Sequence, residues 1–237
     1  MLRRAGILVL VFLVSEDLAT ATTIVIMRTT TGFVVGADSL ARVEEVNGTR
    51  RAGHMCKVGS LGPNQYVAVA GILEFLPSGL DTWRIIEKIA ARGGPLPAKG
   101  AQIESELRSV LDATASWSAE PVKVQVALFG FEADRPVLLL STYESKVDGT
   151  GKIASRTSTE LLSDEVLLFG ESAAAAAFEK SRGRINKEDP VAGVRELIQA
   201  QIQATPDSVG PPINILKIDA AGYTWAEEGQ VCATRLP

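Results

Sequence analysis

The feature that most constrains the fold is a pair of short apolar runs joined by a polar turn near the start of the chain. Residues 23–27 read Thr-Ile-Val-Ile-Met and residues 33–37 read Phe-Val-Val-Gly-Ala. Continuous apolar, β-branched runs of this length are typical of strands buried on both faces. The Thr-Thr-Thr-Gly segment between them predicts a hairpin. With the turn centred on Thr30 and Thr31, the antiparallel register places Asp38 beside Thr23.

The remaining chain alternates between blocks of strands and blocks of helices. A second hairpin is predicted from residues 55–61 and 65–70, around the turn at 62–64. The positions of Gly and Pro and the spacing of the apolar residues predict the other elements. A polar loop is predicted at 42–51, and helices at 72–92, 100–116, 172–180 and 190–204. Strands are predicted at 122–131, 136–142, 152–157, 166–169, 212–218 and 223–225. Strands and helices segregated in this way suit an α+β fold of two sheets with helices on their outer faces. One domain is predicted over residues 22–237.

Composition excludes several classes of protein and site. The chain has 237 residues, 46% of them hydrophobic, and a formal net charge of −4, which argues against a disordered or coiled-coil protein. A pI near 5.2 without a basic block argues against nucleic acid as the main partner. With one His and two Cys, a structural zinc site of four Cys/His ligands is excluded. We expect no metal and no other cofactor.

Residues 1–21 have the pattern of a secretory signal. Arg3 and Arg4 precede an apolar stretch at 5–14, and the segment ends Ala19-Thr20-Ala21, a small-x-small cleavage pattern. The alternative is a buried N-terminal helix. Cleavage after Ala21 predicts a secreted or periplasmic protein that is not membrane-bound in its mature form. An oxidising compartment would permit a bridge between Cys56 and Cys232, although two buried free thiols fit the sequence as well.

Cleavage at that point would make Thr22 the first residue. An N-terminal threonine carries a nucleophile and a base together, because its hydroxyl can attack a carbonyl while its α-amine takes the proton. The reference pKa of an α-amine is about 7.7–8.0, so no histidine is required. The alternative is that Thr22 is simply the first residue of a strand.

The residues around Thr22 resemble a known family. Residues 22–25, Gly32 and the Gly-Ala-Asp-Ser of 36–39 are similar to the start of a proteasome β-type subunit or of its bacterial relative, the HslV-type peptidase. Lys57, in Cys-Lys-Val-Gly, and the Ala-Gly of 70–71 fit the family's next motifs. The resemblance is to an N-terminal nucleophile (Ntn) hydrolase with a secretory signal in place of the propeptide, and it implies a four-layer αββα sandwich. It is clear over residues 22–71 and weaker beyond.

The resemblance implies a role for each matching residue. Thr22 is the nucleophile and its amine the base, and Lys57 lowers the effective pKa of the hydroxyl. Asp38 holds Lys57 charged and in place, and the N–H of Gly71, at a helix start, donates to the oxyanion. Each residue also has a structural alternative when it is taken alone. Lys57 could be a surface lysine, Asp38 a turn or cap residue, and Gly71 a residue of a tight bend.

The second half of the chain departs from the family. Asp207 and Ser208 resemble an Asp and a Ser that support the N-terminal amine, but here they are adjacent rather than three positions apart. The family's Gly-Ser-Gly is replaced by Gly170-Glu171-Ser172, so a serine that supports the amine is displaced or missing. Support of the amine is therefore the part of the site that the sequence defines least.

These observations predict a threonine-type hydrolase that cleaves peptide or amide bonds through an acyl-enzyme. Its expected substrates are peptides or unfolded chains, and the resemblance implies a homo-oligomer. Residues 1–21 could be removed by signal peptidase or autocatalytically. Two alternatives stay open: an amidase acting on a small molecule, and a catalytically silent assembly or binding protein of the same fold.

Overall fold

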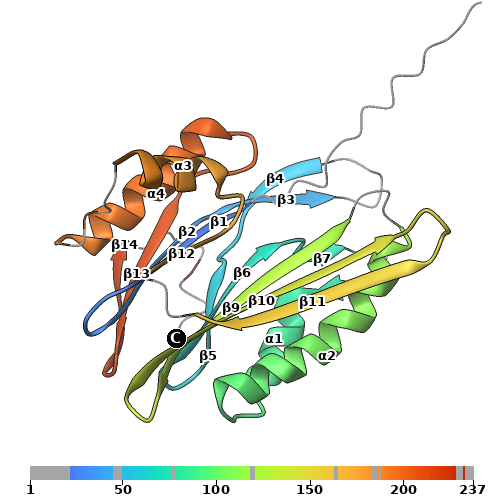
Figure 1. The fold of residues 1–237 in the computed structure, drawn as a ribbon, viewed down its shortest axis with the longest axis horizontal. Helices are drawn as coiled ribbons and strands as arrows, with labels where there is room; N and C mark the ends of the chain where they lie inside the picture. Colours follow the sequence, from blue (N-terminus) through green and yellow to red (C-terminus); the bar gives the residue numbers. More distant parts are fainter. Residues whose placement is uncertain are drawn as a thin grey trace, which may run out of the picture.

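The structure is a computed structural model that describes residues 22–44, 50–75, 78–117, 121–162, 165–182, 186, 188–227 and 232. The predicted signal at 1–21 lies outside the described residues. The described part contains two five-stranded sheets and two two-stranded sheets, with helices on the outer faces of the larger pair (Figure 1).

The first sheet has the order β12-β1-β2-β13-β14, with every neighbouring pair antiparallel. Its strands are β1 (Thr23–Arg28), β2 (Gly32–Asp38), β12 (Val166–Gly170), β13 (Ile213–Asp219) and β14 (Gly222–Glu227). The predicted first hairpin and its register are confirmed, because Ile24 faces Ala37. The N–H of Thr29 closes the turn by donating to the carbonyl of Gly32 at 2.9 Å.

The second sheet has the order β11-β10-β9-β6-β5 and is also antiparallel. Its strands are β5 (Val58–Gly62), β6 (Gln65–Gly71), β9 (Val122–Glu132), β10 (Arg135–Val147) and β11 (Ile153–Leu161). The pairing of β5 with β6 confirms the predicted second hairpin. The two small sheets pair β3 (Leu40–Glu44) with β4 (Arg50–His54), and β7 (Glu74–Phe75) with β8 (Leu80–Asp81).

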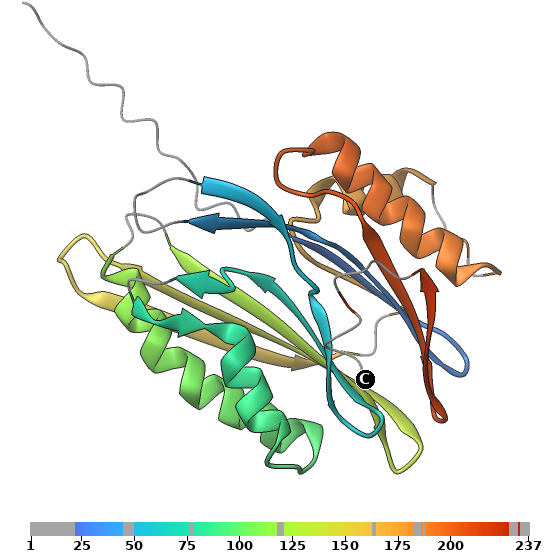
Figure 2. The ribbon, with the colours of Figure 1, turned by 180° about the vertical axis from the view of Figure 1, so that it is seen from behind.

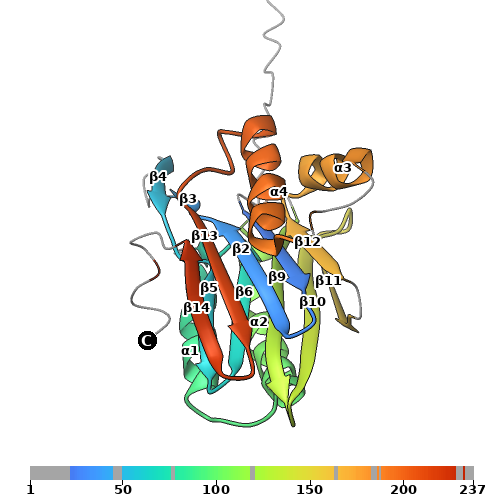
Figure 3. The same ribbon diagram turned by 90° about the vertical axis from the view of Figure 1, so that its left-hand side faces the viewer.

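Each large sheet carries a pair of helices. Helices α3 (Ala173–Arg182) and α4 (Pro190–Ala204) lie on the first sheet, and Figure 3 shows α4 across its outer face. Helices α1 (Thr82–Ala90) and α2 (Leu96–Ala115) lie side by side on the second sheet (Figure 2). Alternate residues of β1 face different cores: Ile24 and Ile26 pack between the sheets, while Val25 packs against α4. Strand β1 is therefore buried on both faces, as its sequence predicts.

The expected fold class, an α+β four-layer αββα sandwich, is corrected by this architecture. Among the described residues, antiparallel strands form four sheets and dominate the regular structure, with four helices beside them. The meander β9–β10–β11 contributes many of the strand residues, and β10 alone has 13. Antiparallel neighbours need only short turns and no crossover helix. The protein is accordingly described as mainly antiparallel β with two helical pairs.

Two local predictions were also wrong. The helix expected at 72–92 begins only at Thr82, where the Asp81 carboxylate caps it by accepting from the N–H of Arg84 at 2.9 Å. The short strands β7 and β8 lie in the preceding segment, at its described residues 74–75 and 80–81. The polar loop expected at 42–51 contributes instead to the β3–β4 pair, in which Leu40 faces His54; residues 45–49 of that loop lie outside the described residues.

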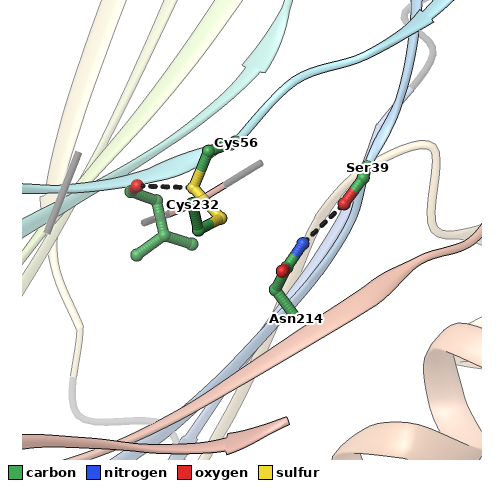
Figure 4. The surroundings of a disulfide bond; sticks show 5 residues. Ser39, Cys56, Asn214 and Cys232 are labelled. Atoms are coloured by element: carbon green, nitrogen blue, oxygen red, sulfur yellow. Dashed lines mark hydrogen bonds between the residues drawn. A yellow bond between two sulfur atoms is a disulfide. The ribbon is translucent and has the colours of Figure 1, made fainter. Parts of the chain in front are cut away.

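The two cysteines form a disulfide bond, with Cα atoms 4.9 Å apart (Figure 4). Both cysteines are buried. The N–H of Met55 donates to the carbonyl of Ser39 at 2.8 Å, so Cys56 lies beside the end of β2. The bridge therefore ties a residue near the C-terminus to the segment that carries Lys57. No helix in the described ranges has the length and apolar character needed to cross a membrane.

Candidate active site

Thr22 lies directly before β1, an interior strand of the first sheet, at the end where β1 pairs with β12. Its carbonyl oxygen accepts a hydrogen bond from the N–H of Glu171 at 2.6 Å. The following residue, Thr23, faces Gly170 across the two strands. Thr22 and Thr23 are both buried. The hairpin and the β1–β12 pairing thus fix the backbone of Thr22 from two sides.

The Asp38 carboxylate, at the end of β2, is the centre of the site. Its Oδ1 accepts from the N–H of Thr23 at 2.7 Å and from the Lys57 ammonium at 2.9 Å. Its Oδ2 accepts from the N–H of Leu40 at 3.1 Å and from the N–H of Gly210 at 3.2 Å. Burial raises the pKa of Asp38, and the Lys57 ammonium opposes that rise. Because four donors point at two oxygens, the ionised carboxylate, which only accepts, is the form that satisfies them all.

Lys57 is buried together with its partner. The side chains of Lys57 and Asp38 are both 0% exposed, and the Lys57 Nζ also donates to the carbonyl of Leu40 at 2.6 Å. Burial lowers the pKa of Lys57, while the Asp38 charge works against that decrease. A buried ammonium is retained only when it is paired and hydrogen-bonded. Lys57 is therefore an interior lysine, and the alternative of a surface lysine is wrong.

Gly71 is the last residue of β6 and not the start of a helix, which corrects the expected setting of this residue. Its φ is +102°, and an added Cβ would lie 2.2 Å from the carbonyl oxygen of Lys123. Both facts require glycine at this position. The neighbouring Ala70 lies near Thr22, because an added Cβ on Gly170 would approach both the Ala70 Cβ and the Thr22 carbonyl oxygen.

Asp207 and Ser208 lie in the turn between α4 and β13 and have different surroundings. Ser208 is buried, and its hydroxyl donates to the Glu171 carboxylate at 2.6 Å. Asp207 is exposed. Two residues further on, the N–H of Gly210 donates to Asp38. The structure thus brings Ser208 to the Thr22 end of β1, whereas the Asp207 side chain faces outward.

Glu171 also lies at this site, a position that the sequence did not predict. Its backbone contacts Thr22 and Thr23, because the Thr23 hydroxyl donates to the Glu171 carbonyl at 2.5 Å. Its carboxylate contacts Ser208. Gly170, the last residue of β12, directly precedes Glu171, but nothing in the sequence shows that β12 pairs with β1. Beside Asp38, the side-chain amide of Asn214 donates to the hydroxyl of Ser39 at 2.5 Å (Figure 4).

Gly170 offers a test of how tightly the Thr22 backbone is held. Its φ is +78°, and an added Cβ would lie 2.1 Å from the Thr22 carbonyl oxygen. Gly151 has the same φ of +78° but nothing within 4 Å of an added Cβ. We expect Gly151→Ala to lower the free energy of unfolding by about 1–2 kcal/mol, the cost of a left-handed alanine. Gly170→Ala should cost at least about twice that, since backbone atoms must move as well.

Urea denaturation of both variants measures this difference. Equal losses for Gly170→Ala and Gly151→Ala would show that the Thr22 carbonyl can move freely away from β12, contrary to the geometry described above.

The comparisons with known proteins give a likeness of fold. No protein-family model matches the chain, and no curated protein matches it. Similar solved structures include the Anbu (Gly-1) mutant from Hyphomicrobium sp. strain MC1, with 12% identity, 90% of this chain and 87% of that chain covered, and a TM-score of 0.57. Another is Anbu (ancestral beta-subunit) from Yersinia bercovieri, with 13% identity, coverage of 87% and 88%, and a TM-score of 0.55.

These results correct the family assignment made from the sequence. No family model and no curated relative shows membership of the proteasome β-type or HslV family. The motifs at residues 22–71 are too short, against a background of 12–13% identity, to show membership. The comparisons show a likeness of fold to these two Anbu structures and nothing narrower.

Proposed function

We propose that the chain, once residues 1–21 are removed, is an N-terminal-threonine hydrolase that cleaves peptide or amide bonds through an acyl-enzyme. One observation carries the proposal. The Asp38 Oδ1 accepts both from the Lys57 ammonium and from the N–H that directly follows Thr22. A buried cation is thereby anchored next to the residue that would carry the nucleophile and the base.

The reaction can be written for these residues. The Thr22 hydroxyl attacks the substrate carbonyl, and its proton passes to the free α-amine of the same residue. The resulting ammonium returns a proton to the leaving amine as the carbon–nitrogen bond breaks, leaving an ester on Thr22. Water then attacks the ester, with the amine again taking the proton, and releases the acid. The Lys57 cation favours the developing alkoxide, and Asp38 keeps that cation in position.

The N–H of Gly71 is the proposed oxyanion donor. In an antiparallel strand, alternate N–H groups point to the same side. The N–H of Val69 donates to the carbonyl of Lys57 at 2.9 Å, so the N–H of Gly71 extends toward the same edge of the sheet. A backbone donor held there can stabilise charge on the oxygen of the tetrahedral intermediate. Its position at a strand end replaces the helix start expected from the sequence.

Maturation and location form part of the proposal. We propose that residues 1–21 are a secretory signal and that its removal frees the Thr22 amine in a secreted or periplasmic protein. The Cys56–Cys232 disulfide supports this location, because disulfides persist in oxidising compartments. We also propose that the protein assembles with copies of itself, on analogy with the Yersinia protein described as a β-subunit.

A substrate panel tests the function. Processed protein is incubated with short fluorogenic peptides, an unfolded protein and simple small-molecule amides, each beside Thr22→Ala. Turnover of peptides that disappears in Thr22→Ala supports the peptidase. Turnover of the simple amides alone would favour the amidase. No turnover of any substrate by a protein shown to begin at Thr22 would contradict hydrolysis and favour a silent assembly protein.

A further inference from the structure

Glu171 lies opposite Thr22 in the β1–β12 ladder. The last paired residues are Thr23 and Gly170, and one step further the N–H of Glu171 donates to the Thr22 carbonyl at 2.6 Å. At the other end of the same ladder, the N–H of Arg28 donates to the carbonyl of Glu165 at 2.7 Å. The two bonds share one register, so the even-numbered residues of β1 form the hydrogen-bonded pairs with β12.

This register determines which way the Thr22 nitrogen points. In a hydrogen-bonded pair of an antiparallel ladder, the N–H and the C=O of a residue both point to the facing strand. The nitrogen of Thr22 is therefore on the Glu171 side. The nitrogen of Thr23 points the opposite way, and it does donate to Asp38 on β2. A free α-amine at Thr22 would thus face Glu171 and turn away from the Asp38–Lys57 pair.

The Glu171 carboxylate is held at this end of the sheet. Its Oε2 accepts from the hydroxyl of buried Ser208 at 2.6 Å. The same turn donates to Asp38 through the N–H of Gly210, so it spans the Thr22 end of β1. Within the described ranges, Ser208 is the one side chain that donates to this carboxylate, and no Lys or Arg pairs with it. The second carboxylate oxygen is available to an ammonium group.

We propose that Glu171 is the positioning residue of the Thr22 α-amine, holding the ammonium form by an ion pair while Ser208 orients the carboxylate. The inference rests on the proposed function and assigns support of the amine, which the sequence defines least, to Glu171. The other charged side chains described near this end of β1 are either paired or exposed. Asp38 and Lys57 neutralise one another, and Asp207 is exposed. Among the described residues, Glu171 therefore carries a charge at this end of β1 that no Lys or Arg balances.

The sign of the effect follows from the charge. A carboxylate beside an ammonium favours the protonated form, so it raises the pKa of the amine above its reference of about 7.7–8.0. A more basic amine accepts the hydroxyl proton more readily, but it is free only at higher pH. Glu171→Gln keeps the shape of the side chain and removes the charge, so the pKa of the amine should fall by about one unit.

The test measures the amine itself as well as activity. The protein is processed to begin at Thr22, in a secreting host or at a protease site placed before Thr22. Its α-amine is then ¹³C-methylated and titrated by NMR. Glu165→Gln is the matched control, because it removes the same charge at the far end of β12. Glu171→Asp should restore part of the shift, since it keeps the charge on a shorter side chain.

A fall of about one unit in Glu171→Gln, with Glu165→Gln unchanged, supports the inference, and the acid limb of the kcat/KM profile should move with it. An amine pKa that is equal in wild type and Glu171→Gln overturns it. If the pKa shifts while neither protein turns over any substrate, the proposed function fails and the role of Glu171 stands. If the processed protein turns over a substrate but Glu171→Gln does not change the pKa of the amine, the proposed function stands and the role of Glu171 fails.

Discussion

Replacing Thr22 by alanine should abolish hydrolysis while leaving the fold intact. The substitution removes the hydroxyl and keeps the α-amine, the Thr22 carbonyl that accepts from Glu171, and the Asp38–Lys57 pair. We expect kcat/KM to fall by about 10⁴-fold or more, as losses of a catalytic serine do in other hydrolases. Thr22→Ser keeps a hydroxyl at the same place and should retain most of the activity. Initial rates on the best substrate of the panel measure all three proteins.

The control for this prediction is the neighbouring Thr23→Ala, which removes a hydroxyl whose hydrogen bond goes to the Glu171 carbonyl. That change should lower stability more than it lowers kcat/KM per folded molecule. If Thr22→Ala kept wild-type activity in a preparation free of wild-type protein, Thr22 would not be the nucleophile and the proposed mechanism would be wrong.

The second large effect concerns the buried pair of Lys57 and Asp38. Removing one partner leaves an uncompensated buried charge, which typically costs about 3–5 kcal/mol. We therefore expect Lys57→Met to lower the free energy of unfolding by about that amount, and Asp38→Asn to do so as well. The double variant should be less destabilised than the sum of the two single variants, because the partners are in direct contact. Urea denaturation measures the stabilities.

Activity per folded molecule distinguishes the role of this pair in the proposed mechanism from its role in stabilising the fold. Lys57→Met should also lose activity per folded molecule, since the proposed mechanism uses this cation to favour the developing alkoxide. The matched control is Lys88→Met, which removes an ammonium from an ion pair of similar length, 2.7 Å to Glu106, on the surface. It should change neither stability nor activity appreciably. A Lys57→Met protein with full stability and full activity would refute both assignments.

How much the sequence predicts depends on the range of the contact. The first hairpin is local, so its turn residues and apolar runs predict the register, and with it the meeting of Asp38 and Thr23. The contact of Thr23 with Glu171 joins residues 148 positions apart. No turn or spacing encodes such a pairing, so Glu171 could not be placed at the site from the sequence alone.

The errors also have physical causes. The segment after Gly71 contains apolar residues at spacings that suit a helix, but Asp81 offers a cap only near its middle, and Pro77 precedes it. Pairing of β7 with β8 competes successfully before that cap. Asp207 and Ser208 are adjacent in a turn, where successive side chains point in different directions, so only Ser208 reaches Glu171. Spacing alone could not distinguish the two.

The central claim is that Thr22 carries both the nucleophile and the base. An epoxyketone tests it most directly, because this reagent closes a ring with a hydroxyl and a free α-amine on the same residue. The processed protein is treated with the reagent, and intact mass and peptide mapping locate the adduct. The account predicts one adduct per chain, on Thr22, in a protein whose first residue is Thr22, and none on Thr22→Ala. A protein that begins at any other residue, or an adduct elsewhere, would contradict it.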